Sequence, residues 1–239
     1  MAALPLPEAV LRRRAVRHFK PDPLPPGILE TLLDLANRAP SGFNLQPWHF
    51  VVVTEPARRA ALREAALGQV QVGEAPATVV FVADPDSWRL HLEEVLAMGK
   101  AEGAVSPNYE RQLRRTVPPA FALGPLGLLG LARALFLPLR RLFPPTPTLP
   151  VNRSGLRTYA VKQTMLAAQT FMLAAAASDL DTCPMEGIDE ARIKRLLGIP
   201  RRMTIPVIVP VGYAADDLPP KPPRFPLERK LHRERFSSG

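Results

Sequence analysis

The sequence predicts an α+β fold, with a sheet flanked by helices, in one domain that takes up residues 1–239. Two observations support this fold class. Helix and strand patterns alternate through the first half of the chain, and a long apolar helix pattern precedes a last strand in the second half. A chain of 239 residues that is 46% hydrophobic can also bury one sizeable core.

The first half begins with a helix pattern that places apolar residues at i, i+3, i+4 and i+7. These residues are Leu29, Leu32, Leu33, Ala36 and Ala39. Pro40 ends the helix, because proline disfavours helical geometry in the residue before it. Residues 49–54 are rich in β-branched side chains and predict a strand. A helix is predicted next over 55–67, with Thr54 as its cap and Pro56 in its first turn.

The remaining elements are a strand, two helices and a last strand. Residues 75–83 form a continuous apolar run, which is typical of a strand buried on both faces. Residues 160–177 are apolar almost all round, which indicates a helix buried in the protein or in a subunit interface. A shorter amphipathic helix is predicted over 188–197. The last strand, 205–212, contains two prolines and is therefore expected at an edge or in an irregular position.

The turn between the first helix and the first strand has the sequence S-G-F-N-L-Q-P-W, residues 41–48. It combines small, amide and aromatic groups, which suit a flat polar ligand. The alternative is a polar helix-to-strand loop with a core tryptophan, since short motifs often match by chance.

A basic run lies about thirty residues earlier and carries five cations in residues 12–20. Val16 and Phe19 can anchor this segment in the core. Such runs are often solvated faces or nucleic-acid contacts. Guanidinium groups also bind phosphate through paired charge-assisted hydrogen bonds. Together with the amide-rich turn, the run therefore favours a phosphorylated cofactor over a polynucleotide.

Four ordered motifs resemble the nitroreductase family of FMN flavoproteins. The first is R-R-x-x-R-x-F, which starts at Arg13, and the second is A-P-S-x-x-N-x-Q-P-W-x-F-V-V-V over residues 39–53. The third is C-P-M-E-G-I-D at 183–189, and the fourth is the basic pair in K-P-P-R-F-P-L-E. The matches span roughly residues 8–83 and 158–236 and leave the middle of the chain uncovered.

The resemblance implies a central, mostly antiparallel sheet flanked by helices, in an intertwined homodimer with FMN at the subunit interface. It further implies that NADH or NADPH donates a hydride through flavin N5 to an electron-poor small-molecule acceptor, a nitroaromatic or a quinone, by a ping-pong mechanism. Relatives of the same fold carry out reductive dehalogenation or fragment the flavin, and these alternatives stay open.

The resemblance also assigns expected roles to residues that match the motifs. Arg13 and Arg14 would hold ribityl and phosphate oxygens, and Arg17 would supply the cation near N1 and the C2 carbonyl. The full set of expected cofactor-binding residues is Arg13, Arg14, Arg17, Pro40, Ser41, Asn44, Gln46, Gln69, Pro184, Met185, Glu186, Gly187, Lys221 and Arg224. Ser41 and Asn44 would act from the opposing subunit. Either Gln69 or Gln71 would face the flavin, with Glu186 and Gly187 near N5.

Other polar residues are interpreted as structural. We expect Arg12 and Lys20 to be solvated, Trp48 to lie in the core, and Cys183 to be a packing residue, since no catalytic-cysteine signature surrounds it. The four histidines are scattered without ligand spacing, so no metal site is predicted. The chain shows no cleavable signal pattern, and a cytoplasmic location is expected.

The middle segment, about residues 88–157, is expected to be a variable apolar lid, and a Pro-rich arm is expected over about 213–239. Residues 117–132 carry no charge. A membrane span needs about 20 apolar residues and would have to tolerate Arg133. A lid over the flavin is favoured. The third interpretation is a weak membrane-surface contact through segment 117–143. The net charge of +9 suits anionic cofactors, nucleic acid or lipid surfaces alike.

Overall fold

A four-stranded antiparallel sheet forms the centre of the protein. The computed structural model describes residues 4–140 and 142–236. The strands run in the order β1 (Trp48–Val53), β2 (Ala77–Ala83), β4 (Thr204–Gly212) and β3 (Asp181–Thr182), and each neighbouring pair is antiparallel. The mostly antiparallel sheet that the resemblance implies is therefore confirmed.

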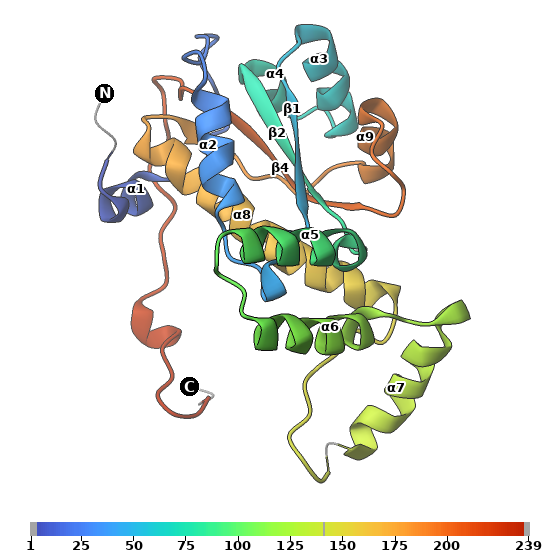
Figure 1. Cartoon of the computed structure of the whole chain (residues 1–239). Helices are drawn as coiled ribbons and strands as arrows, with labels where there is room; N and C mark the ends of the chain where they lie inside the picture. The colour runs from blue at the N-terminus through green and yellow to red at the C-terminus, as the bar shows by residue number, and fades with distance from the viewer. Residues whose placement is uncertain (1–3, 141, 237–239) are drawn as a thin grey trace.

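Helices cover both faces of this sheet and extend beyond one end of it (Figure 1). The α-helices are α1 (Leu6–Arg12), α2 (Ile28–Asn37), α3 (Pro56–Ala65), α4 (Val70–Glu74), α5 (Ser87–Ala101), α6 (Pro107–Phe121), α7 (Leu128–Arg140), α8 (Arg153–Ala177) and α9 (Glu190–Leu197). The short 3-10 turns between and after them are η1 (Gly42–Asn44), η2 (Pro125–Gly127) and η3 (Leu227–Arg229).

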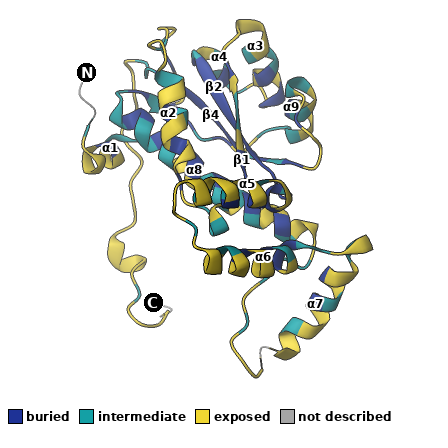
Figure 2. Cartoon of the chain, viewed as in Figure 1, coloured by how far each residue is buried: buried dark blue, intermediate teal, exposed yellow. Residues whose placement is uncertain are grey.

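The core has two halves because successive strand residues point to opposite faces of a sheet. Val80 and Ile208 pack with residues of α3, α4 and α9 on one face. Val79 and Phe81 pack with α2 and α8 on the other face. Every residue of β2 is buried, which confirms the prediction of a strand covered on both faces (Figure 2).

Two predicted helix starts need correction. The residue before α3 is Glu55, without a side-chain cap, so the prediction of Thr54 as the cap was wrong. Instead, the Thr54 carbonyl accepts a 3.1 Å hydrogen bond from Arg59 Nε. The long helix begins at Arg153, well before residue 160, because the Asn152 side chain caps it by accepting from the Gly155 N–H at 2.8 Å.

The two prolines of β4 occupy an internal strand, so the edge alternative was wrong and the irregular one is confirmed. The Pro210 carbonyl accepts from the Cys183 N–H at 3.1 Å, on the side of the short strand β3. The nitrogen of Pro210, which has no hydrogen to donate, faces the same side. Pro206 lies where the β2–β4 register shifts, between the Phe81–Val207 and Ala83–Thr204 pairs. A central strand tolerates proline at such positions.

The middle of the chain is helical. A third cluster joins α5, α6 and the start of α8, with Leu96, Val117 and Leu156 fully or almost fully buried. Helix α7 projects beyond this cluster (Figure 1). Among the described residues, no single helix is long and apolar enough to cross a membrane. The pair α6 and η2–α7, bent by 68°, passes that test only when taken together.

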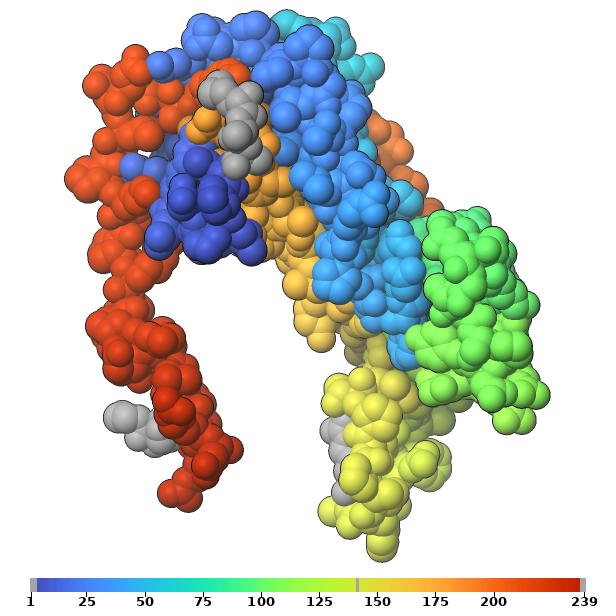
Figure 3. All heavy atoms as spheres, turned by 60° about the vertical axis from the view of Figure 1, so that its left-hand side comes forward, coloured from blue at the N-terminus to red at the C-terminus, as the bar shows by residue number. Residues whose placement is uncertain are grey.

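The chain after β4 leaves the body as an extended arm, and the short turn η3 is its regular element among the described residues. Figure 3 shows this arm and the α7 region projecting from the same side of the body, with open space between them.

Candidate functional site

An open cleft of about 620 Å³ lies between three segments that are distant in sequence. Arg17 comes from the basic run, Gln69 and Gln71 come from the start of α4, and the turn 183–187 supplies the opposite wall. The cleft thus brings together seven of the residues singled out from the sequence: Arg17, Gln69, Gln71, Pro184, Met185, Glu186 and Gly187.

The turn 183–187 is held by the sheet. Cys183 donates its N–H to the Pro210 carbonyl, and Met185 exchanges two backbone hydrogen bonds with Ile208, at 2.9 and 3.0 Å. These contacts bury Met185 and direct the next two residues outward. In the part of the chain that the structure describes, neither the Glu186 nor the Gly187 N–H has a hydrogen-bond partner. Both N–H groups are therefore available to a ligand.

The two glutamines have different positions. Gln69 Nε2 donates to the Gly187 carbonyl at 2.9 Å, which joins α4 to the opposite wall. Gln71 is only 7% exposed and donates from Nε2 to Gln69 Oε1 at 3.1 Å. Gln69 is therefore the side chain next to the available N–H groups, and the buried Gln71 orients it through this hydrogen bond.

Cys183 is buried at the back of the cleft, as predicted for a packing residue. Burial raises the pKa of its thiol, and the opposing effects of the Arg17 charge and the Gln71 amide are smaller. The thiol is therefore protonated at neutral pH and is a poor nucleophile. Arg17 lines the same cleft and places its positive charge there.

The basic run joins the N-terminal segment to two other parts of the molecule. Arg12 was expected to be solvated, and this was wrong: its Nη1 donates to the Ala176 carbonyl at 2.7 Å and pairs with Asp179 at 3.0 Å. The two carboxylates near the end of α8, Asp179 and Asp181, account for the difference. Lys20 is also paired, at 2.5 Å with the exposed Asp216.

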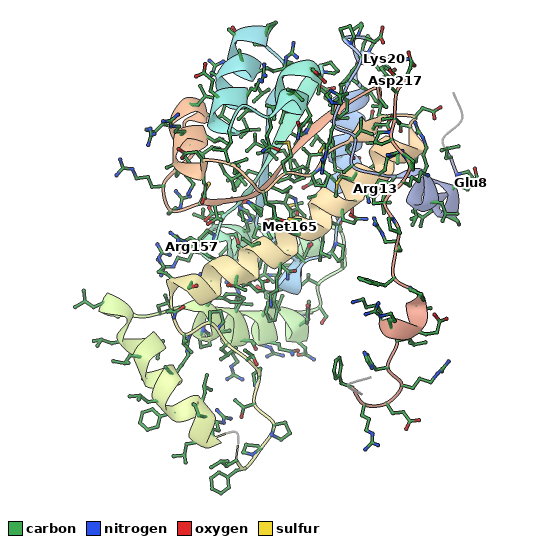
Figure 4. The ribbon with its side chains drawn as sticks, turned by 180° about the vertical axis from the view of Figure 1, so that it is seen from behind. Glu8, Arg13, Lys20, Arg157, Met165 and Asp217 are labelled. Atoms are coloured by element: carbon green, nitrogen blue, oxygen red, sulfur yellow. The ribbon has the colours of Figure 1, made fainter. Side chains whose placement is uncertain are left out.

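Two predicted phosphate ligands connect the basic run with the C-terminal arm. Arg14 Nη2 donates to the Pro219 carbonyl and to the Pro220 carbonyl, the latter at 3.3 Å. Lys221 Nζ donates to the Leu11 carbonyl at 2.8 Å. Arg13 lies on the same side, where the arm leaves the body (Figure 4). The buried Arg14 Nε has no hydrogen-bond partner among the described residues, so this cluster retains donor capacity.

Arg224 lies further along the arm and is exposed, and its Nη1 contacts the neighbouring Pro223 carbonyl at 3.3 Å. Within the described ranges, no hydrogen bond joins it to the other predicted ligands.

The turn at 40–46 is built by its own side chains and by α8. Ser41 Oγ accepts from the Gln46 N–H at 2.9 Å, and Gln46 Nε2 donates to the Asn44 carbonyl at 3.3 Å. Gln46 thus closes the turn. Pro40 and Asn44 are exposed, and Asn44 has a positive φ of 53°. Its amide side chain extends into solvent.

Two α8 residues that were not predicted hold this turn. Tyr159 donates to the Gly42 carbonyl at 2.9 Å, and Gln163 Oε1 accepts from the Gly42 N–H at 2.9 Å. A Cβ at position 42 would come within 2.6 Å of the Tyr159 hydroxyl, so this contact requires glycine. Tyr159 and Gln163 are four residues apart and so share one face of α8, but other polar residues on this helix gave no sequence signal that distinguishes them. Trp48 is buried, as predicted, and donates to Asn37 Oδ1 at 2.9 Å.

The turn and the cleft lie at opposite ends of the sheet. The turn leads into the start of β1, which pairs with the end of β2, whereas α4 of the cleft leads into the start of β2. A six-residue strand spans roughly 17–20 Å, so one chain does not place both groups of residues around the same ring.

The residues of the cleft and of the basic cluster suit a flat ligand with an anionic end. The cleft offers backbone and amide donors together with a guanidinium group, and the Arg14–Lys221 cluster offers cations at a separate position. These donors match the ring carbonyls and nitrogens and the phosphate of a flavin mononucleotide.

Comparison with known proteins agrees with the fold and the motifs. The family model described as the nitroreductase family matches residues 10–213. A protein named NADH dehydrogenase from Thermus thermophilus is 34% identical over 221 residues, which cover 92% of each chain. An oxygen-insensitive NAD(P)H nitroreductase from Salmonella typhimurium is 29% identical, covering 92% of this chain and 95% of that protein.

Solved structures share the fold. A protein from Exiguobacterium sibiricum, described as a nitroreductase in complex with FMN, superposes with a TM-score of 0.75. It is 24% identical, and the match covers 98% of this chain and 99% of that one.

Proposed function

The chain belongs to the nitroreductase family, and on this basis we propose that it is an FMN-dependent oxidoreductase that takes a hydride from NADH or NADPH. The proposed acceptor is an electron-poor small molecule, a nitroaromatic or a quinone. The names of its relatives support this proposal, since they include NAD(P)H nitroreductases and a structural neighbour that contains FMN.

One observation carries the proposal. Two free backbone N–H groups, a positioned amide and a guanidinium group meet in a single cleft, from Glu186, Gly187, Gln69 and Arg17 among the described residues. When bound, FMN supplies the ring atom that accepts and then donates the hydride. The chain's own task is to bind and orient the ring, and to place positive charge beside it.

Each side of the cleft has a separate task. The N–H groups at 186 and 187 would donate to the edge of the ring, and the sheet holds them rigid through Met185. Arg17 would stabilise negative charge on the pyrimidine side, because a fixed cation lowers the energy of an anion that develops next to it. Gln69, oriented by Gln71, would hydrogen-bond to the same side.

Phosphate binding is proposed for the second cluster. Arg14 and Lys221 join the N-terminal segment to the C-terminal arm, Arg13 precedes Arg14 in that segment, and Arg224 follows Lys221 along the arm. A phosphate would replace carbonyl oxygens as the acceptor of the Arg14 and Lys221 hydrogen bonds, which are stronger to a charged acceptor.

The proposed protein is a homodimer, and the separation of the two groups supports this. Pro40, Ser41 and Asn44 would reach the flavin from the partner copy, because within one chain they lie a strand's length from the cleft. In that copy, Gln46 would hold the turn 40–46 in shape through its hydrogen bond to the Asn44 carbonyl and would not contact the ligand.

Mixed dimers test the shared site. Arg17→Ala and Asn44→Ala would each impair both sites of a pure dimer. A mixed dimer of these two variants would regain one intact site, because that site takes Arg17 from the Asn44 variant and Asn44 from the Arg17 variant. Recovery of NADH-dependent turnover on mixing is the expected result. Turnover no higher than the mean of the two pure variants would contradict a site shared between subunits.

One cleft for donor and acceptor predicts ping-pong kinetics, since both would have to stack on the same ring in turn. Parallel double-reciprocal plots are expected, and intersecting plots would contradict a common site.

Arg17 gives the sharpest single-residue test of the cofactor site. A charge-assisted hydrogen bond contributes about 1.5–3 kcal/mol, so Arg17→Ala is expected to raise the FMN dissociation constant by roughly 10- to 150-fold. Arg58→Ala is the matched control, because Arg58 is an exposed arginine that pairs with Glu55 at the start of α3. Titration of the apoprotein with FMN, followed by flavin fluorescence, measures both. Equal effects of the two substitutions would show that Arg17 is only part of a basic patch.

A further inference from the structure

Helix α7 and the turn before it present a large apolar surface to solvent. Its exposed side chains are Leu126, Leu128, Leu129, Leu131, Leu135, Phe136 and Leu139. At 100° per residue, those within the helix cover roughly half of its circumference. Figure 2 shows α7 exposed along most of its length, standing away from the body. Soluble surfaces rarely leave such contiguous apolar areas uncovered.

A buried arginine fixes the direction of this surface. Arg133 is the one cation within α7 before its last residue, and it points toward the body. It donates to the carbonyls of Pro119, Ala120, Ala122 and Pro150, which join the end of α6 to the return segment. Gly130 lies on the same side, where an added Cβ would clash with the Val151 carbonyl. The helix therefore has a polar, anchored side and an apolar, free side.

The charged residues of the segment 111–178 are all of one sign, although Arg114 pairs with Glu93 and Glu110, and Arg153 pairs with Asp86. Residues 111–178 contain nine lysines and arginines and no acidic residue, which leaves 22 cations for the 22 acidic residues of the rest of the chain. The net charge of +9 thus resides in the segment that contains α7. Its exposed members include Arg111 and Arg115 on α6, Arg140 at the end of α7, and Arg157 on α8 (Figure 4).

We propose that the free side of α7 docks on an anionic lipid bilayer, with its leucines and Phe136 inserted at the headgroup boundary and the flanking arginines against the lipid phosphates. Thirteen residues are too few to span a bilayer, which needs about 20, so the helix lies in the plane of the interface. This inference does not depend on the proposed flavin chemistry.

The charge of this segment favours an anionic bilayer over the α7 region of a second copy as the partner of α7. A copy that covered α7 with its own α7 region would bring two strongly basic segments together, whereas an anionic bilayer complements both the charge and the apolar surface. The α7 residues are also absent from the lining of the cleft that contains Arg17. Within one chain, the apolar side of α7 therefore takes no part in that cleft.

Vesicle flotation of the full-length protein tests the proposal. Phosphatidylcholine vesicles are compared with vesicles that also contain phosphatidylglycerol, at about 0.1 M and 1 M NaCl, because the Debye length falls from about 10 Å to 3 Å over that range. We expect flotation with the anionic vesicles, weakened at high salt, and little with phosphatidylcholine alone. Absence of wild-type flotation with the anionic vesicles would overturn the proposal.

A matched pair of variants locates the contact. Leu135→Ser/Leu139→Ser changes two side chains of α7 that are 66% and 59% exposed, and Leu6→Ser/Val10→Ser changes two on α1 that are 64% and 51% exposed. Both pairs have i, i+4 spacing on a helix. The α7 pair is expected to lower the vesicle partition coefficient by at least about tenfold, because it removes inserted apolar surface, and the α1 pair is expected to have little effect.

Three outcomes would overturn the docking assignment. In the first, the two pairs of substitutions reduce flotation equally. In the second, light scattering shows that the α7 substitutions alone convert a lipid-free dimer to a monomer. In the third, the α7 substitutions abolish turnover while the wild-type protein binds no vesicles. The second outcome would show that a partner copy covers α7, and the third would show that α7 is a lid. The FMN spectrum of each variant is recorded separately, so failure of the flavin proposal and failure of membrane docking give different results.

Discussion

The contact between Gly42 and Tyr159 gives a prediction that can be worked out from distances. In Gly42→Ala, the new Cβ would lie 2.6 Å from the Tyr159 hydroxyl and 3.4 Å from the nearest ring carbons. Tyr159 has little freedom to move, because its ring packs edge-on against Phe121 at 4.7 Å between centroids. We expect a loss of about 1–3 kcal/mol from overpacking, with about 1 kcal/mol more if the hydrogen bond to the Gly42 carbonyl breaks.

A double-mutant cycle isolates this clash. Tyr159→Phe alone should cost about 0.5–1.5 kcal/mol, since it removes the hydrogen bond to Gly42. In the double variant the hydroxyl is gone and the closest remaining atoms are at 3.4 Å, so the double variant should be at least about 1 kcal/mol more stable than the sum of the single effects predicts.

Urea denaturation measures each free energy of unfolding at one pH. Burial raises the pKa of Tyr159 to about 12, so its hydroxyl is protonated throughout the usual range. Gly103→Ala is the control, because Gly103 has a positive φ of 68° but a Cβ added there would meet no described atom within 4 Å. Its cost should be additive with Tyr159→Phe. Additive costs for the Gly42 pair would refute the claim that Tyr159 requires glycine in this turn.

Three further predictions concern single groups. Arg12→Ala should lower the free energy of unfolding by about 1–2 kcal/mol in urea denaturation, and Lys20→Ala should lower it much less, because Arg12 bonds to the end of α8 whereas Lys20 pairs with an exposed carboxylate. Equal losses would contradict this. Arg133→Met should make the α7 region more sensitive to limited proteolysis, whereas Arg115→Met, at an exposed position of α6, should not. Equal resistance of the two variants to the protease would show that the four carbonyl contacts of Arg133 are dispensable. His49 is an exposed residue of β1, but partial desolvation of its ring lowers its pKa below 6.5. The unfolded chain therefore takes up the proton first as pH falls, and stability should decrease modestly from about pH 7 to pH 5. His49→Gln should flatten that slope in urea midpoints, and an unchanged slope would assign it to other groups.

Local patterns predicted the sheet and its covering helices well. The β-branched run of β1, the apolar run of β2 and the helix-ending Pro40 all depend on near neighbours in sequence. Two predictions about single residues failed. Thr54 lost the capping position because α3 starts one residue later, and Arg12 is paired because β3 and the end of α8 place two carboxylates beside it.

Candidate ligands were predictable as residue types but not as an arrangement. Gln69 differs from Gln71 in its contact with Gly187, and only the packing of α4 against the turn 183–187 creates that contact. The support of the 41–46 turn by α8 joins residues more than a hundred positions apart. The orientation of α7 likewise depends on the contacts of Arg133 with four carbonyls that the sequence pattern does not reveal.

The visible spectrum of the purified protein, recorded without oxygen before and after NADH or NADPH, tests the central claim most directly. The cleft formed by Arg17, Gln69, Glu186 and Gly187 predicts a yellow protein whose flavin absorbance bleaches when the nicotinamide is added. A colourless protein that FMN does not reconstitute would contradict the account.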